Sequence, residues 1–274
     1  MKTPSRLIIV VCLLFAVAFA YTSWKMGLEN TPVYIIPLIV MMATAFVMAP
    51  QIDWWWYKRN PRDIDPMLGN LFQKHLTFYQ NLNEADKLRF RQRVDLYLMT
   101  VEFIVPSQNE EKVIPEDLKH WVSAYRTMTT WGKEKIENEK FEKIVAYMNP
   151  FPSPQHPHDF HACESFEEDG VLLFALAPMI HSITAPSQCF NPVLYEFCKV
   201  FQTTYWSKHP ELNESHWADL EQISGFSKEQ IHKTIGLPDI DIRAVAMSFY
   251  ILFPQRFKRF LPSQTEGLKE TFGF

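Results

Sequence analysis

Two uncharged apolar runs near the N-terminus constrain the fold of this chain more than any other feature. Residues 7–24 begin with LIIVVCLLFAVAFAY, and residues 33–50 read VYIIPLIVMMATAFVMAP. Each run is about long enough to cross the ~30 Å hydrocarbon layer of a bilayer as a helix. Pro37 lies in the first turns of the second run, where a missing N–H is best tolerated. A short polar turn separates the runs, so the sequence predicts a transmembrane helical hairpin over residues 1–62.

Basic residues around the two runs predict the orientation of the hairpin. Lys2 and Arg6 precede the first run, and Lys58, Arg59 and Arg62 follow the second. Because Lys and Arg gather on the cytoplasmic side, we expect a multi-pass protein of the inner (cytoplasmic) membrane with both termini in the cytoplasm. Four consecutive aromatic residues form the expected interfacial belt where the second span leaves the bilayer: Trp54, Trp55, Trp56 and Tyr57.

A cleaved signal peptide is the alternative interpretation of the first run. Ala18-Phe19-Ala20 resembles a small-x-small cleavage site, and the basic residues before the run fit the start of a signal peptide. The second run would then return the chain to the cytoplasm. The remainder of the protein is therefore expected on the same side in either case.

The charge of the chain divides at the end of the hairpin. The 274 residues carry 27 Lys and Arg against 31 Asp and Glu, a net charge of −4. Residues 1–62 hold six of the basic and two of the acidic residues, a net of +4, which leaves −8 on residues 63–274. The basic hairpin suits an anionic inner leaflet, whereas an acidic domain is poorly suited to neutralising phosphates. We therefore expect the lipid bilayer as a partner, and no nucleic acid.

Residues 63–274 have the patterns of one mostly helical α+β domain. Segments 143–148 and 171–176 are short, apolar and bounded by turn residues, which predicts the strands of a small sheet. The Pro- and His-rich stretch 151–161 between them predicts a loop. Helical spacing, capping residues and stop signals predict the remaining elements as helices over 68–79, 83–105, 118–132, 191–205, 227–236, 242–252 and 260–274.

One stretch has the frame of a zinc-peptidase helix, although the intact motif is absent. The chain contains no Gly-rich phosphate loop, no G-x-S-x-G and no H-E-x-x-H. Residues 191–199 read NPVLYEFCK. With His at positions 195 and 199, this stretch would read N-x-V-x-H-E-F-x-H.

This frame and several other stretches make nearly all of residues 66–274 similar to the Mlc titration factor A (MtfA) family of zinc-dependent peptidases. The resemblance implies a zincin-like metallopeptidase scaffold that follows the hairpin. The other stretches that resemble the family, in chain order, are residues 78–103, 114–132, 144–151, 164–173 and 244–254.

The resemblance also implies that the zinc ligands of the family are replaced in this chain. In the family, two His of the motif and a Glu of a later helix bind zinc, and the Glu of the motif is the general base. Here Tyr195 and Lys199 take the two His positions, and Ser248 takes the later Glu position. Glu196, at the general-base position, is retained, and Gln202 replaces the Asp that follows the second His.

These replacements predict that the zinc site is lost, so we expect no cofactor. A hydrolytic zinc site needs three protein ligands and an open position for water. A lysine cation repels the metal, and a tyrosine phenol with a pKa near 10 is a poor ligand at neutral pH. Glu196 would then be an idle general base. We expect Lys199 to form an ion pair with Glu196 at i, i+3, and Tyr195 to fill the vacated volume.

The favoured interpretation is a membrane-anchored, catalytically inactive homologue with a binding or regulatory role. The family is known for binding a transcriptional repressor, which gives a precedent for a protein partner without identifying one here. Two alternatives stay open. The chain could be an active metal-dependent peptidase whose non-standard site combines Glu196 with the loop histidines, or a structural subunit of a membrane complex that interacts through its hairpin.

Other metal-ligating candidates have a weaker basis. His156, His158, His161 and Cys163 have a spacing that could ligate a metal, although such a Pro-rich loop is more often solvated. The acidic run 164–169 could hold Ca²⁺, but it also fits the lead-in to a strand. Three other histidines are expected to be partly packed: His75, His120 and His181. The four cysteines are expected to be reduced thiols: Cys12, Cys163, Cys189 and Cys198.

Overall fold

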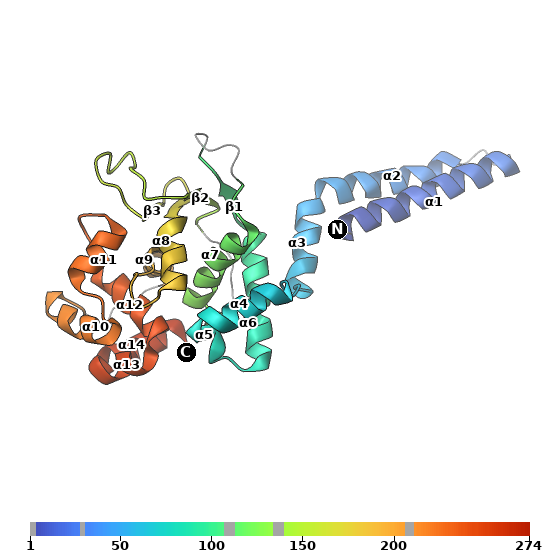
Figure 1. Cartoon of the computed structure of the whole chain (residues 1–274). Helices are drawn as coiled ribbons and strands as arrows, with labels where there is room; N and C mark the ends of the chain where they lie inside the picture. The colour runs from blue at the N-terminus through green and yellow to red at the C-terminus, as the bar shows by residue number, and fades with distance from the viewer. Residues whose placement is uncertain (1–3, 28–30, 107–112, 134–139, 206–210) are drawn as a thin grey trace. The chain divides into compact units, whose positions relative to one another are not determined.

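The computed structural model describes residues 4–27, 31–106, 113–133, 140–205 and 211–274 (Figure 1). The chain divides into two compact units, Met1–Arg62 and Asp63–Phe274. Helices make up most of the described residues, and all the described strands belong to the second unit. The fold class is therefore mostly helical α+β, as the sequence predicts, while the zincin-like scaffold stays a prediction.

The first unit is a pair of antiparallel apolar helices followed by a shorter helix. Its elements are α1 Pro4–Met26, α2 Thr31–Val47 and α3 Ala49–Arg59. α1 and α2 lie side by side, with the sulfur atoms of Cys12 and Met41 3.5 Å apart and the rings of Phe19 and Tyr34 stacked at 5.2 Å. By length and composition, α1 can cross a membrane.

The second apolar run differs from the expected span at its C-terminal end. We expected it to cover residues 33–50, but α2 ends at Val47 and α3 continues at 69° to it. Pro50 explains the break, because it has no N–H for the carbonyl of Phe46 and its ring would clash with that carbonyl in a continuous helix. α2 and α3 have the length of a span only when they are counted together across this bend.

The helices of the second unit include several whose limits the sequence predicts. The expected capping box at Ser227 and Gln230 is formed, and the helix after it ends at Gly236, whose φ is 83°. In chain order the helices are α4 Pro66–His75, α5 Thr77–Gln80, α6 Glu84–Leu98, α7 Glu116–Thr129, α8 Leu176–Thr184, α9 Pro192–Tyr205, α10 Trp217–Ser224, α11 Lys228–Ile235, α12 Ile242–Leu252, α13 Pro254–Phe260 and α14 Pro262–Phe272, with a 3₁₀ turn η2 at Glu214–His216.

These helices accompany a mixed four-stranded sheet of order β1-β2-β4-β3. Its strands are β1 Glu102–Ile104, β2 Lys143–Tyr147, β3 Cys163–Phe166 and β4 Val171–Ala175. β2 runs parallel to both β1 and β4, whereas β3 pairs antiparallel with β4 at one edge. The strands expected over 143–148 and 171–176 are confirmed as β2 and β4, each one residue shorter.

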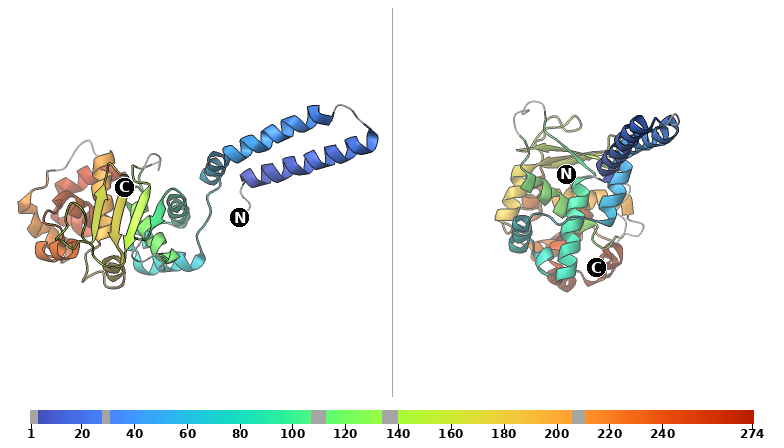
Figure 2. Two further views of the ribbon diagram at one scale, coloured as in Figure 1. Left: turned by 90° about the horizontal axis from the view of Figure 1, so that it is seen from above. Right: turned by 90° about the vertical axis from the view of Figure 1, so that its right-hand side faces the viewer.

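Alternation along the strands sends side chains to opposite faces of the sheet. Ile144 and Leu172 belong to the main hydrophobic core, whereas Val145 and Leu173 belong to a small second cluster with Phe151. Figure 2 shows the helices of the second unit gathered on one side of the sheet. α9 packs against β3 at the edge and against α7 and α12, so its position is fixed from several sides.

The helix expected over 68–79 is wrong, because it is broken at Leu76. This residue has extended backbone (φ −105°, ψ 101°) and separates α4 from α5. The Gln80 side-chain amide donates to the carbonyls of Gln73 and Lys74, at 3.0 and 3.4 Å. These carbonyls at the C-terminal end of α4 therefore have a hydrogen-bond donor. Both pieces pack on one core, which is why the apolar spacing continues across the break.

The helix expected over 83–105 is wrong in its second half. Asn83 caps α6, accepting the Asp86 N–H at 2.9 Å, but α6 ends at Leu98 and β1 follows. Residues 101–105 read VEFIV, which are mostly β-branched and aromatic residues that favour a pleated surface. α8, α10 and α13 are further elements that the sequence patterns did not separate.

Candidate functional site

α9 carries four of the five positions that the family resemblance singles out. The Asn191 side chain caps it by accepting the Leu194 N–H at 2.9 Å, and Pro192 is its first residue. Ten of its fourteen residues are buried. A helix buried on most of its circumference can hold a charged side chain only where a partner compensates the charge.

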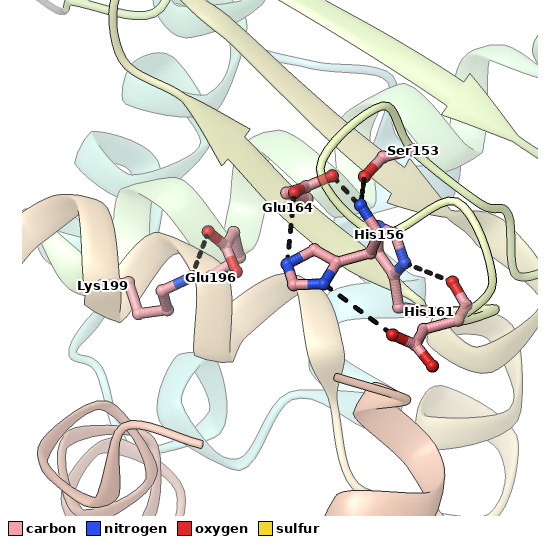
Figure 3. Close-up of polar contacts among 7 residues, drawn as sticks. Ser153, His156, His161, Glu164, Glu196 and Lys199 are labelled. Carbon is pink, nitrogen blue, oxygen red and sulfur yellow. Dashed lines mark hydrogen bonds and ion pairs between the residues drawn. The ribbon is translucent and has the colours of Figure 1, made fainter. Parts of the chain in front are cut away.

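Glu196 and Lys199 form that compensated pair, as the sequence predicts. The Lys199 ammonium lies 3.0 Å from Oε1 and 3.2 Å from Oε2 of Glu196 (Figure 3). The Glu196 side chain is fully buried, while the Lys199 side chain is 30% exposed. Burial alone would lower the pKa of the Lys199 amine, but the Glu196 carboxylate and other acidic groups nearby together raise that pKa. Lys199 is therefore a cation at every physiological pH.

Tyr195 is a buried structural residue in this arrangement. Its hydroxyl accepts the backbone N–H of Asp241 at 3.0 Å, and its ring packs edge-on against Phe190 at 5.9 Å. Burial, and then the Glu196 carboxylate, raise the phenol pKa well above its usual value. Tyr195 therefore stays protonated and binds the loop before α12.

Ser248 lies on α12, where this helix packs against α9. Its hydroxyl donates to the Ala244 carbonyl at 2.9 Å and lies 3.5 Å from Sγ of Cys198. Burial raises the pKa of the Cys198 thiol to about 12. Ser248 is thus joined to Cys198, which lies on α9 between Tyr195 and Lys199. Gln202 is also buried, and its Nε2 has no partner among the described residues.

An open cleft of about 720 Å³ lies over this part of α9. Tyr195 and Lys199 reach it from the helix, and His156 reaches it from the loop before β3. Asp241 and Arg243 also line the cleft and are joined by an ion pair of 3.2 Å. The other lining residues are Glu211, Leu212, Leu237, Pro238, Asp239, Ile240 and Ile242.

The loop histidines do not converge in the way that their spacing suggested. His161 is fully buried, with Nε2 3.1 Å from Oε2 of Glu164 and Nδ1 2.9 Å from the Asp159 carbonyl. His156 Nε2 is 3.9 Å from the other oxygen of Glu164 (Figure 3). His158 is exposed. Within the described parts of the chain, no three His, Cys, Asp or Glu side chains form a group able to hold a metal ion.

Cys163 belongs to the main core and not to the histidine cluster. It precedes Glu164 on β3, so the two side chains point to opposite faces of the sheet. Burial, and then the nearby Glu196 carboxylate, raise the pKa of the Cys163 thiol well above its usual value. The described cysteines are free thiols, as expected.

The other candidate groups are dispersed. In the acidic run, Glu164 pairs with His161, and Glu167 pairs with Lys140. His75 packs edge-on against Trp121, and His120 Nδ1 lies 2.6 Å from the Glu116 carbonyl. His181 is exposed, so the expectation that it is partly packed is wrong.

Comparisons of this chain with protein families, with curated proteins and with solved structures found no match. The resemblance to MtfA-like peptidases therefore stays a prediction from the residues of this sequence.

Proposed function

We propose that the chain is a membrane-anchored, catalytically inactive member of the MtfA-like zinc-peptidase family. Its second unit would face the cytoplasm at the inner membrane, and it would act there by binding or regulating a protein partner. The hairpin would cross the membrane twice, with both termini on the cytoplasmic side.

The observation that carries this proposal is the Lys199 ammonium bound to both oxygens of Glu196. In a zinc hydrolase, the general base must accept a proton from a metal-bound water. Here the carboxylate is buried and held by a permanent cation, so it has no open oxygen for a water. A zinc ion at the same helix face would also meet the charge of Lys199.

The cleft supports a binding role in place of catalysis. It stays open above Tyr195 and Lys199 and is lined by both apolar and charged side chains. A concave surface of this kind suits a peptide segment of a partner. The net charge of −8 on residues 63–274 argues against nucleic acid as that partner.

The lengths and charges of the first unit support the anchor. α1 has 23 residues, which corresponds to about 34 Å and exceeds the ~30 Å hydrocarbon layer. Arg6 precedes its apolar run, and Arg59 and Arg62 follow the second run, which fits a cytoplasmic location for both ends.

Metal analysis of the full-length protein, purified from membranes without chelators, tests the catalytic part of this proposal. We expect zinc far below one atom per chain and no peptidase activity. Stoichiometric zinc with activity that Glu196→Ala abolishes would instead favour an active peptidase with a non-standard site. Exchange of residues 1–62 for an unrelated hairpin tests the alternative of a structural subunit of a membrane complex. A subunit that acts through its hairpin would lose function on this exchange.

A further inference from the structure

We infer that α3 is an interfacial helix that lies across the membrane surface and binds anionic phospholipid headgroups through its Trp- and Arg-bearing face. This inference rests on the anchor in the proposed function and goes beyond it, because it assigns a lipid class and a binding surface to a defined element. It concerns the first unit alone.

The level of α3 in the membrane follows from its link to the start of α1. The Asp53 carboxylate accepts the backbone N–H of Ser5 at 3.0 Å and its hydroxyl at 2.8 Å. Asp53 thus binds an N–H in the first turn of α1, where a carboxylate is also favoured by the helix dipole. The first turn of a spanning helix lies at the membrane surface, so α3 lies there as well.

The bend keeps α3 at that level over its whole length. α2 has 17 residues and rises about 25 Å, which nearly crosses the hydrocarbon layer. α3 is about 16 Å long, and at 69° to α2 it advances only about 6 Å further along the α2 axis. The headgroup layer on each side of a bilayer is about 5–8 Å thick, so α3 fits within it.

The two faces of α3 have different surroundings. The inner face is occupied, since Asp53 binds Ser5 and Tyr57 is only 7% exposed. Trp55 and Trp56 are 52% and 46% exposed on the outer side. Exposed indole rings are favoured at the level of the headgroups, where an apolar ring can be buried while its N–H stays hydrated.

Basic side chains lie against aromatic rings on both faces of α3. The Arg59 guanidinium stacks over the Trp55 ring at 4.0 Å, and Arg62 stacks over the Tyr57 ring at 4.8 Å and donates to its hydroxyl at 3.0 Å. A stacked guanidinium keeps N–H donors at its edge, where they can bind phosphate oxygens. With exposed Lys58 beside them, these cations match an anionic leaflet and not a neutral one.

Spin-labelled lipids measure this preference on the full-length chain. The protein is reconstituted in phosphatidylcholine vesicles, and association of spin-labelled phosphatidylglycerol is compared with that of spin-labelled phosphatidylcholine. We expect a preference of about fivefold, the effect of one cation near an anionic surface. The triple variant Lys58→Gln, Arg59→Gln, Arg62→Gln should lose it. Arg59→Gln should weaken it, whereas the matched control Lys25→Gln, at the other end of α1, should not.

Depth measurements test the orientation independently. Spin labels on Gln51→Cys and Lys58→Cys, in a Cys189→Ser background, should differ in depth by about 4 Å, while a helix continuing along the membrane normal would give about 10 Å. Equal association of the two lipids, or the larger depth difference, would overturn the inference. Release of the whole protein by alkaline carbonate would instead overturn the anchor itself, so the two failures are distinguishable.

Discussion

Glu196 on α9 and Glu164 on β3 are two buried carboxylates with a basic partner three residues away, but their environments differ. Both oxygens of Glu196 contact Lys199, at 3.0 and 3.2 Å. Only one oxygen of Glu164 is bonded to His161, and the other has no hydrogen-bond partner among the described residues. The first carboxylate is compensated by a cation at both oxygens, while the second has a hydrogen-bond partner at only one oxygen.

This difference indicates which buried charge is essential to the fold. Removing one partner of a buried ion pair leaves an uncompensated charge and is strongly destabilising. Glu164 has one oxygen without a hydrogen bond and with only a distant contact to His156, at 3.9 Å, so its charge contributes less. The following variants test this contrast, from the largest expected effect to the smallest.

Lys199→Met should give the largest loss. It leaves Glu196 buried without a cation, and we expect the free energy of unfolding to fall by about 3–5 kcal/mol in urea titrations. The double variant Glu196→Leu, Lys199→Met should recover most of this loss. Lys228→Met is the matched control, because the Lys228–Glu214 pair is exposed and is expected to lose far less stability than the buried pair. Equal losses for the two lysines would contradict the contrast.

Gly236→Ala should disturb the loop that carries His161, the partner of Glu164. A Cβ there would lie 2.2 Å from the Phe160 carbonyl oxygen, next to His161, in a backbone with φ of +83°. We expect a loss of about 2–3 kcal/mol. Gly225→Ala has nearly the same φ but nothing within 4 Å, so it should lose only about 1 kcal/mol. Thermal unfolding of both variants measures the difference, and similar losses would argue against tight packing of this loop.

Alkaline pH should lower the free energy of unfolding through Cys198 on α9. Its pKa is raised from 9.0 to about 12 in the folded chain, so the unfolded chain ionises first and rising pH favours unfolding. The stability from this group is present below pH 9 and lost between pH 9 and 12, by about 2 kcal/mol at pH 10.5. Cys198→Ala should reduce the loss between pH 8 and 10.5 by about this amount. An unchanged pH dependence would contradict it. Lys199 acts in the same direction, because its raised pKa stabilises the fold until it loses its proton.

Glu164→Gln should give the smallest effect, about 1 kcal/mol in urea titrations at pH 7. It keeps the volume and the contact with His161, and it removes a charge that is only partly hydrogen-bonded. Glu196→Gln should lose about 2–3 kcal/mol, because it breaks a charge-assisted pair. A larger loss at Glu164 than at Glu196 would reverse the comparison.

The predictable parts of this molecule are those that depend on local spacing. The Glu196–Lys199 pair follows from i, i+3 spacing on one helix, and the α11 limits follow from a capping box and a glycine. The Leu76 break was hidden because α4 and α5 bury their apolar residues in one core.

The contacts that the sequence did not reveal join distant segments. The Tyr195 hydroxyl meets the Asp241 N–H, 46 residues away, and no spacing rule predicts such a bond. The His161–Glu164 pair has a helical spacing but lies at the start of an edge strand, where neighbouring side chains alternate between faces. Only the course of the preceding loop brings these two side chains together.

Zinc binding by the triple variant Tyr195→His, Lys199→His, Ser248→Glu tests most directly whether α9 and α12 are a peptidase site whose ligands have been replaced. The variant removes the cation and restores the three expected ligands, with Glu196 left as the general base. Titration calorimetry with zinc, on protein whose folding is checked by circular dichroism, is the measurement. The account predicts one zinc per chain in the variant and none in the parent. A folded variant that binds no zinc, or a parent that binds it equally well, would contradict the account.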